Sequence, residues 1–309
     1  MASDTQAPLT TGPDTELGVD GVPRGQKVLD KLVDRLNLER IEVNLFRGVS
    51  PVESPPRVFG GQVAGQALVA AGRTVPADRG VHSLHAYFIR PGDPAIPIVY
   101  EVDRVRDGRS FTTRRVMAIQ HGQPIFSLSA SFQLAQPGLE HTEPMPTGIP
   151  GPEQLPDTGA LIAGLGVEPG LFHLLPRPLD IRYVGAPLWS PEFVPTDEPL
   201  RVWMRADGTL PDDELLQVCL LTYASDLTLL GSVLARHGRA EAEKPNNRAS
   251  LDHAMWFHQS FRADEWLLYE CHSPVASGAR GLATGRFFTQ DGRLVATALQ
   301  EGLVRVSPK

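Results

Sequence analysis

The sequence predicts an α+β fold in which an antiparallel sheet curls around long helices, and three observations predict it. First, Glu214 to Leu230 is a helix-length run that is apolar on nearly all sides. A helix without a polar face has to be wrapped by other elements. Second, strand-like runs joined by short turn dipeptides lie before and after this segment. Third, the pattern of one helix and several strands occurs twice.

The composition describes an ordinary globular chain. It has 309 residues, of which 41% are hydrophobic and 21% charged, with a net charge of −7. Mild acidity without a dense Lys/Arg run argues against a nucleic-acid partner. Cys219 and Cys271 lack metal-ligand spacing, which is typical of reduced thiols in a reducing compartment. With no signal sequence and no apolar run of ~18 residues, we expect a cytoplasmic protein that does not enter the membrane.

The chain divides into four segments. Residues 1–26 are rich in Thr, Asp, Gly and Pro, and we expect a disordered tail. Residues 27–135 form the first unit and 179–309 the second. Residues 136–178 are crowded with Pro and Gly and predict a long linker, with one helix over about 159–166.

In the first unit, Gly60 to Arg73 predicts a helix of small residues. It has neither the Lys-Ser/Thr of a phosphate-binding loop nor the Gly-x-Gly-x-x-Gly spacing of a dinucleotide site. Glycine and alanine at positions such as Gly61 and Gly65 instead predict close approach of another backbone. The predicted strands that follow are 81–90, 97–105, 110–120 and 124–134.

The second unit echoes the first. Gln120-His121-Gly122 corresponds to Gln290-Asp291-Gly292, an offset of 170 residues, and Tyr87-Phe88 corresponds to Trp256-Phe257, an offset of 169. Two copies of a helix wrapped by a sheet indicate a tandem duplication, a double hotdog. Because each half alone would expose a sheet edge, we expect the two sheets to join into one. The strands predicted for the second unit are 179–183, 199–205, 251–258, 265–273, 279–289 and 294–306.

Several ordered stretches between about Leu29 and Arg305 resemble the acyl-CoA thioesterase II family of tandem-hotdog enzymes. The stretches are Phe59-Gly60-Gly61-Gln62, His82-Ser83-Leu84-His85-Ala86-Tyr87-Phe88-Ile89-Arg90-Pro91-Gly92, Tyr223-Ala224-Ser225-Asp226-Leu227, Leu251-Asp252-His253-Ala254-Met255-Trp256-Phe257-His258 and Gln300-Glu301-Gly302.

The resemblance implies hydrolysis of fatty acyl-CoA to free fatty acid and CoA by a water held by Asp226, Ser250 and Gln300. Many relatives have threonine where this chain has Ser250, and serine keeps the hydroxyl while losing the methyl that restricts the rotamer. The family resemblance also implies a homo-oligomer, a dimer or tetramer, with acyl-CoA as substrate. No cofactor is implied, since CoA is part of the substrate.

The residues support this assignment independently. A carboxylate inside an apolar helix is poorly solvated, which should make Asp226 more basic than a surface aspartate. Gln300 shares its strand face with Ala296 and Ala298, whose small side chains leave room beside it. Ser250 alone would be an ordinary hydrogen-bonding serine at a strand entry.

Other interpretations remain open at this stage. A hotdog enoyl-CoA hydratase would pair an Asp with a His, and a non-catalytic acyl-CoA binding protein would need no base. A Ser250-His253-Asp226 triad is disfavoured, because no Gly-x-Ser-x-Gly elbow surrounds Ser250 and three residues along a strand place His253 on the opposite face. No metal site is expected from the pairs of histidines. Candidate CoA-phosphate contacts are Arg57, Arg90, Arg114 and Arg115.

Overall fold

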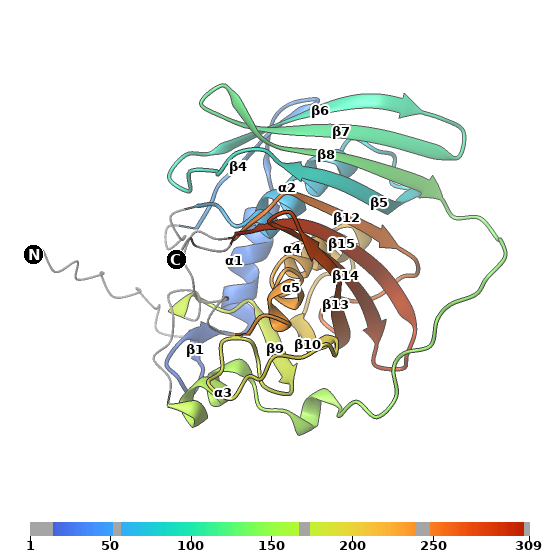
Figure 1. The fold of residues 1–309 in the computed structure, drawn as a ribbon. Helices are drawn as coiled ribbons and strands as arrows, with labels where there is room; N and C mark the ends of the chain where they lie inside the picture. The colour runs from blue at the N-terminus through green and yellow to red at the C-terminus, as the bar shows by residue number, and fades with distance from the viewer. Residues whose placement is uncertain (1–14, 52–56, 167–173, 239–247, 306–309) are drawn as a thin grey trace, which may run out of the picture.

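The computed structural model describes residues 15–51, 57–166, 174–238 and 248–305. Its main feature is one 13-stranded antiparallel sheet that curls around the central helices (Figure 1). In sheet order, the strands of the first half are β3 (Glu39–Glu42), β4 (Leu45–Gly48), β6 (Ile98–Asp107), β7 (Phe111–Gln120), β8 (Gln123–Leu134) and β5 (Arg79–Phe88). The strands of the second half are β12 (Asp252–Phe257), β15 (Leu294–Val304), β14 (Arg280–Thr289), β13 (Leu267–Ser277), β10 (Leu200–Ala206) and β9 (Leu179–Val184), and β11 (Arg248–Ser250) pairs with β15.

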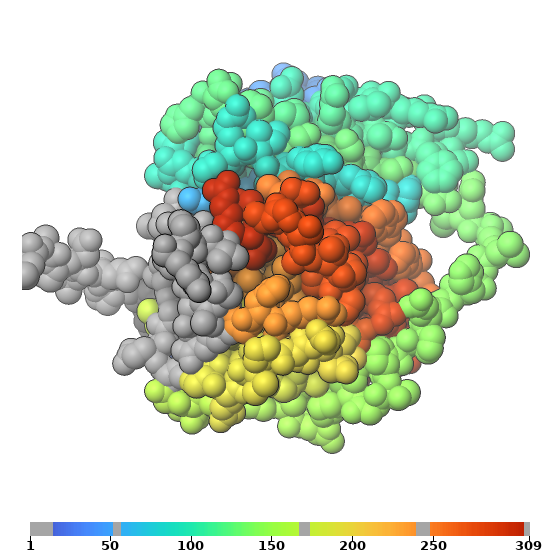
Figure 2. All heavy atoms as spheres, in the orientation of Figure 1, coloured from blue at the N-terminus to red at the C-terminus, as the bar shows by residue number. Residues whose placement is uncertain are grey.

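The two halves of the sheet join where β5 pairs with β12, with Leu84 opposite Met255. The predicted continuous sheet is therefore confirmed, and the two halves are in contact along this seam (Figure 2). The hairpin prediction is confirmed as well. His121 and Gly122 form the two-residue loop between β7 and β8 and have φ angles of 50° and 69°, as a type I′ turn requires.

The small-residue helix α2 (Gly60–Gly72) packs against α4 (Glu214–Ser225). A Cβ atom added at Gly61 would lie 2.3 Å from the carbonyl oxygen of Tyr223, and one at Gly65 would lie 3.1 Å from that of Cys219. Because residue numbers rise on one helix as they fall on the other, the helices are antiparallel. The backbone expected to approach the glycines is that of the second helix, and the start of α2 lies beside the end of α4.

The second helix is shorter than predicted. Asp213 caps its start by accepting a hydrogen bond from the backbone N–H of Leu216 (3.1 Å), but the helix ends at Ser225 and Asp226 is its C-cap. Beyond this point the backbone bonds tighten, with the N–H of Leu227 bonded to the carbonyl of Ala224, and a second short helix, α5 (Gly231–Ala235), follows. The prediction that Asp226 lies inside one helix reaching residue 230 is therefore wrong.

The tail expected to be disordered has structure from residue 15 onward. β1 (Glu16–Leu17) and β2 (Pro23–Arg24) pair with each other, and α1 (Gln26–Leu36) follows. The Arg24 Nε donates to Asp207 (2.9 Å) and its Nη1 to Asp157 (3.2 Å). These partners lie far along the chain, so the composition of the segment could not reveal them. Residues 1–14 lie outside the described part of the chain.

The linker region contains a 3₁₀ turn η1 (Pro152–Gln154) and the helix α3 (Thr158–Leu165), which confirms the helix predicted there. Asp157 caps α3 by accepting from the N–H of Ala160 (2.9 Å).

Among the described residues, no helix is long and apolar enough to span a membrane.

Candidate active site

Asp226, Ser250 and Gln300 come from three elements and meet at the end of α4. Asp226 follows the last turn of that helix, Ser250 ends β11, and Gln300 lies on β15. The Gln300 side-chain Nε2 donates to Asp226 Oδ1 (2.6 Å) and to Ser250 Oγ (3.0 Å). One amide group therefore holds the carboxylate and the hydroxyl together, as their proposed shared role requires.

The position of Gln300 follows from the alternation of β15. Ala296, Ala298 and Gln300 are all fully buried on the strand face that looks toward the helices. Among the described residues, the Gln300 Oε1 atom is buried and has no hydrogen-bond partner. A buried amide oxygen without a partner costs about 1–3 kcal/mol, which a ligand able to donate a hydrogen bond would recover.

The environment of Asp226 makes it a stronger base than a surface aspartate. Burial raises its pKa to about 6, although hydrogen bonds from Gln300 and from the backbone N–H of Gly61 favour the anion and limit the rise. The negative end of the α4 dipole acts in the same direction as burial. At neutral pH the group is mostly ionised and can accept a proton.

The start of α2 forms one wall of this site. A Cβ atom added at Gly60 would lie 2.7 Å from Asp226 Oδ2 and 2.7 Å from the ring of Phe88. Only glycine leaves room for the carboxylate here, and the Gly61 N–H reaches it. The interpretation from sequence assigned these glycines to packing alone. The signal that could have identified them was the Phe59-Gly60-Gly61-Gln62 stretch.

The prediction that His253 lies on the opposite strand face from Ser250 is wrong. Ser250 on β11 lies opposite Gly302, and Ala254 on β12 lies opposite Leu299. The chain therefore advances by four residues from Ser250 to Ala254 while β15 advances by only three. The extra residue shifts the alternation and turns His253 toward the helices.

His253 nevertheless forms no triad. Its Nε2 hydrogen-bonds Ser225 Oγ (2.8 Å) on α4, and no hydrogen bond to Ser250 or Asp226 occurs. Burial lowers the pKa of His253 to about 4, so the ring is neutral at physiological pH. The Asp–His pair that a hydratase would need is not formed by these two side chains.

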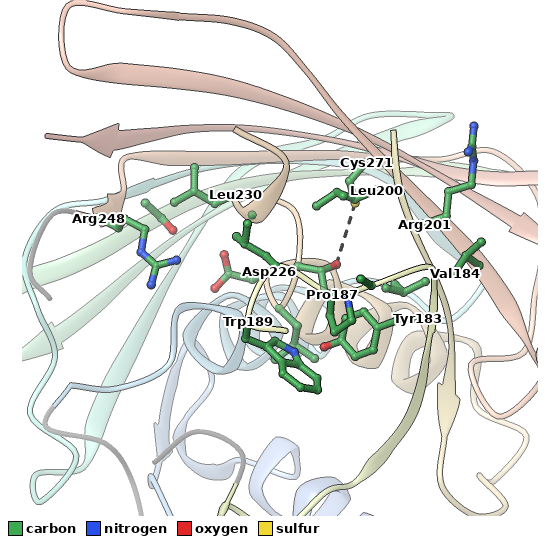
Figure 3. Close-up of a pocket in the computed structure, with 18 residues that line it drawn as sticks. Tyr183, Val184, Pro187, Trp189, Leu200, Arg201, Asp226, Leu230, Arg248 and Cys271 are labelled. Atoms are coloured by element: carbon green, nitrogen blue, oxygen red, sulfur yellow. Dashed lines mark hydrogen bonds between the residues drawn. The ribbon is translucent and has the colours of Figure 1, made fainter. Parts of the chain in front are cut away.

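A cavity of about 490 Å³ opens beside Asp226 and Ser250 (Figure 3). Its walls come from β9, β10, the loop that follows β9, the turn after α4, and β11. Most of the lining is apolar or aromatic; the residues include Tyr183, Val184, Leu188, Trp189, Leu200, Val202, Leu227 and Leu230. A largely apolar cavity with a few polar groups at one point is typical of a small-molecule site.

The arginines predicted to contact phosphate lie elsewhere. Arg57, Arg90, Arg114 and Arg115 do not line the cavity. Arg114 is only 1% exposed, and its guanidinium is held by Thr74 and Asp107. The cations that do line the cavity are Arg201 and Arg248.

Over the described ranges, no group of three or more His, Cys, Asp or Glu side chains could hold a metal ion.

Solved structures share this architecture. Acyl-CoA thioesterase II TesB2 of Mycobacterium marinum is 46% identical and superposes with a TM-score of 0.73, covering 89% of this chain and 98% of that one. The tesB protein of Mycobacterium avium subsp. paratuberculosis is 33% identical with a TM-score of 0.74, covering 90% and 100%. The fold is therefore the double hotdog of the type II thioesterases.

Sequence comparisons agree with the fold. A family model described as acyl-CoA thioesterase matches residues 196–303, and one described as the acyl-CoA thioesterase N-terminal domain matches residues 50–133. Human acyl-coenzyme A thioesterase 8 is 44% identical over 89% of this chain and 88% of its own length. Acyl-CoA thioesterase 2 of Haemophilus influenzae is 38% identical over 91% and 99%. The chain belongs to the acyl-CoA thioesterase family and is a thioester hydrolase that acts on acyl-CoA.

Proposed function

We propose that the hydrolysis takes place by direct attack of a water molecule held by Asp226, Ser250 and Gln300. The observation that carries this proposal is the bridging amide of Gln300, which joins the raised-pKa carboxylate to the hydroxyl at the edge of an apolar cavity. Holding water, base and thioester in one geometry removes much of the entropic barrier to their reaction.

The chemistry assigns one task to each group. Asp226 accepts a proton as the water oxygen bonds to the thioester carbonyl carbon, and Ser250 and the Gln300 amide orient the water. The carbon–sulfur bond then breaks, and the proton held by Asp226 passes to the departing sulfur. The products are the fatty acid and CoA with a free thiol, so no separate cofactor is needed.

The acyl chain would occupy the apolar part of the cavity. Tyr183, Val184 and Leu200 line it on the side of Asp226 opposite Arg248, and burial of each CH₂ group there would contribute about 0.8 kcal/mol. A homo-oligomer, dimer or tetramer, stays a prediction from the family resemblance. Sedimentation that showed a monomer at micromolar concentration would remove it.

The pH dependence of turnover should reflect the Asp226 carboxyl. The base works only when ionised, and its pKa is raised to about 6. We therefore expect kcat to be level above about pH 7 and to fall towards tenfold per unit below about pH 6. Initial rates with saturating acyl-CoA between pH 4.5 and 8.5 would measure this. A rate that stayed constant down to pH 4.5 would exclude Asp226 as the base.

No acyl-enzyme should form on Ser250. The Ser250 Oγ accepts from the Gln300 amide, and neither Asp226 nor a described histidine hydrogen-bonds this hydroxyl directly, so no base is in contact with it to activate it as a nucleophile. Rapid quench followed by intact-protein mass spectrometry should show only unmodified enzyme during turnover. A species heavier by one acyl group that maps to Ser250 and decays at the rate of kcat would overturn the water mechanism.

A further inference from the structure

The two arginines that line the cavity differ in their partners. Arg201 has an ion-pair partner, because its Nε donates to Glu270 Oε2 (2.7 Å), a glutamate that is only 4% exposed and that also pairs with Arg286. The Arg248 side chain has no ion pair or hydrogen bond with any residue that the structure describes. A cation at the wall of a largely apolar cavity, without a partner among the described residues, is a candidate contact for an anionic part of the substrate.

The position of Arg248 indicates which part of the substrate it meets. Arg248 and Ser250 are two residues apart on β11 and share a strand face. Arg248 is exposed and Ser250 is half-buried, so the strand leads from the surface into the site. In Figure 3, Arg248 lies on one side of Asp226, whereas Tyr183 and Val184 lie on the other. Arg201, which is paired with Glu270, lies on the same side as Val184, so Asp226 separates Arg248 from the part of the cavity that Tyr183 and Val184 line.

We propose that Arg248 binds a phosphate of the CoA moiety at the point where the bound substrate extends out of the cavity. The inference rests on the proposed function, in which the thioester lies at Asp226 and the acyl chain occupies the apolar end. The polar CoA moiety then has to extend towards the surface, on the side of Arg248. The chain carries a net charge of −7, which disfavours an anionic substrate unless a local cation offsets it. A guanidinium also offers paired donors that match phosphate oxygens.

The test compares two thioesters that share an acyl group but differ in phosphate. Octanoyl-CoA carries the phosphates, and octanoyl-N-acetylcysteamine does not. We expect Arg248→Gln to raise KM for octanoyl-CoA on the order of 10-fold, with kcat within about twofold, and to leave the second substrate unchanged. Arg248→Lys, which keeps the charge, should recover part of the loss. Because Arg248 is exposed, neither variant should impair folding.

Inhibition by products gives a second readout. Free CoA should inhibit Arg248→Gln about tenfold more weakly than the wild type, whereas pantetheine should inhibit both equally. Arg115→Gln on β7 is the matched control, since it removes one positive charge from an exposed Arg115–Asp103 pair that does not line the cavity.

Three results would overturn the role of Arg248. They are an unchanged KM for octanoyl-CoA, an equal loss on both thioesters, and an equal loss in Arg115→Gln. Failure of the proposed function would look different, because it would appear as an acyl-enzyme on Ser250 or as near-normal turnover of Asp226→Asn, and neither result depends on Arg248.

Discussion

Replacing Asp226 with asparagine should lower kcat about 10²- to 10⁴-fold, because the substitution removes the base while keeping its shape. The introduced amide keeps one oxygen, which can still accept from the Gln300 amide, so KM should change little. Steady-state release of CoA, followed with a thiol reagent, measures both constants. Near-normal turnover in a folded Asp226→Asn variant would contradict the assignment of the base.

Stability provides an internal check on this variant. A carboxyl whose pKa is raised from 3.8 to about 6 on folding stabilises the folded state fully only below pH 4, and this contribution is lost as the pH rises through 6. Above pH 6 the ionised group is a net cost, which asparagine does not carry. Asp226→Asn should therefore unfold at the same temperature as the wild type or higher, so that a loss of rate cannot be assigned to unfolding.

Asp213→Asn is the matched control for loss of charge. It removes one carboxylate from the opposite end of α4, where Asp213 caps the helix through the N–H of Leu216 (3.1 Å). Asparagine is an equally good N-cap. The control should keep wild-type turnover and stability, because it lies at the helix start, away from the cavity.

The regular parts of this fold could be predicted from local patterns. Alternation located the strands, the recurring helix-and-strand pattern indicated two units, and the edge that each unit would expose predicted their union through β5 and β12. The role of Gln300 could also be predicted from the sequence, since its buried neighbours Ala296 and Ala298 are too small to fill the strand face that they share with it.

Features that depend on a one-residue shift in register or on where a helix ends could not be predicted from the sequence. The apolar pattern continues past Ser225, yet the helix ends there because the backbone changes to tighter turns. One extra residue between Ser250 and Ala254 reverses the face on which His253 lies. Neither the helix end nor the extra residue changes the hydrophobic pattern. A prediction from strict periods of 2 or 3.6 residues therefore continues the helix and the strand past these points.

The antiparallel helix pair also explains why the duplicated fold builds its site at one end. At the end that holds Asp226, the start of α2 supplies Gly60 and the Gly61 N–H. At the other end, a Cβ atom added at Gly72 would lie 2.5 Å from Leu215, and the Arg73 guanidinium is held by the Leu38 carbonyl (2.6 Å). Side chains fill that end, and it lacks the carboxylate with its bridging amide.

Close contact of the helices leads to a second large effect, on stability. A methyl group at Gly61 would lie 2.3 Å from the Tyr223 carbonyl oxygen, which belongs to the backbone of α4 and cannot rotate away. Gly61→Ala should therefore force α2 and α4 apart at a cost on the order of 3 kcal/mol. Because the same shift would move the Gly61 N–H away from Asp226, kcat should fall as well.

Alanine substitutions at two other glycines test this prediction, because they are expected to cost less stability. Gly65→Ala would place its methyl 3.1 Å from the Cys219 carbonyl oxygen and should destabilise by about 1 kcal/mol, whereas Gly164→Ala on α3 meets nothing within 4 Å. The last change should be neutral or stabilising, since alanine favours a helix interior over glycine. Urea midpoints for the three variants should follow the order Gly61→Ala, Gly65→Ala, Gly164→Ala, from least to most stable. If Gly61→Ala matched the wild type in midpoint and turnover, the helices could separate without cost, and their close contact would not be what holds Asp226 in place.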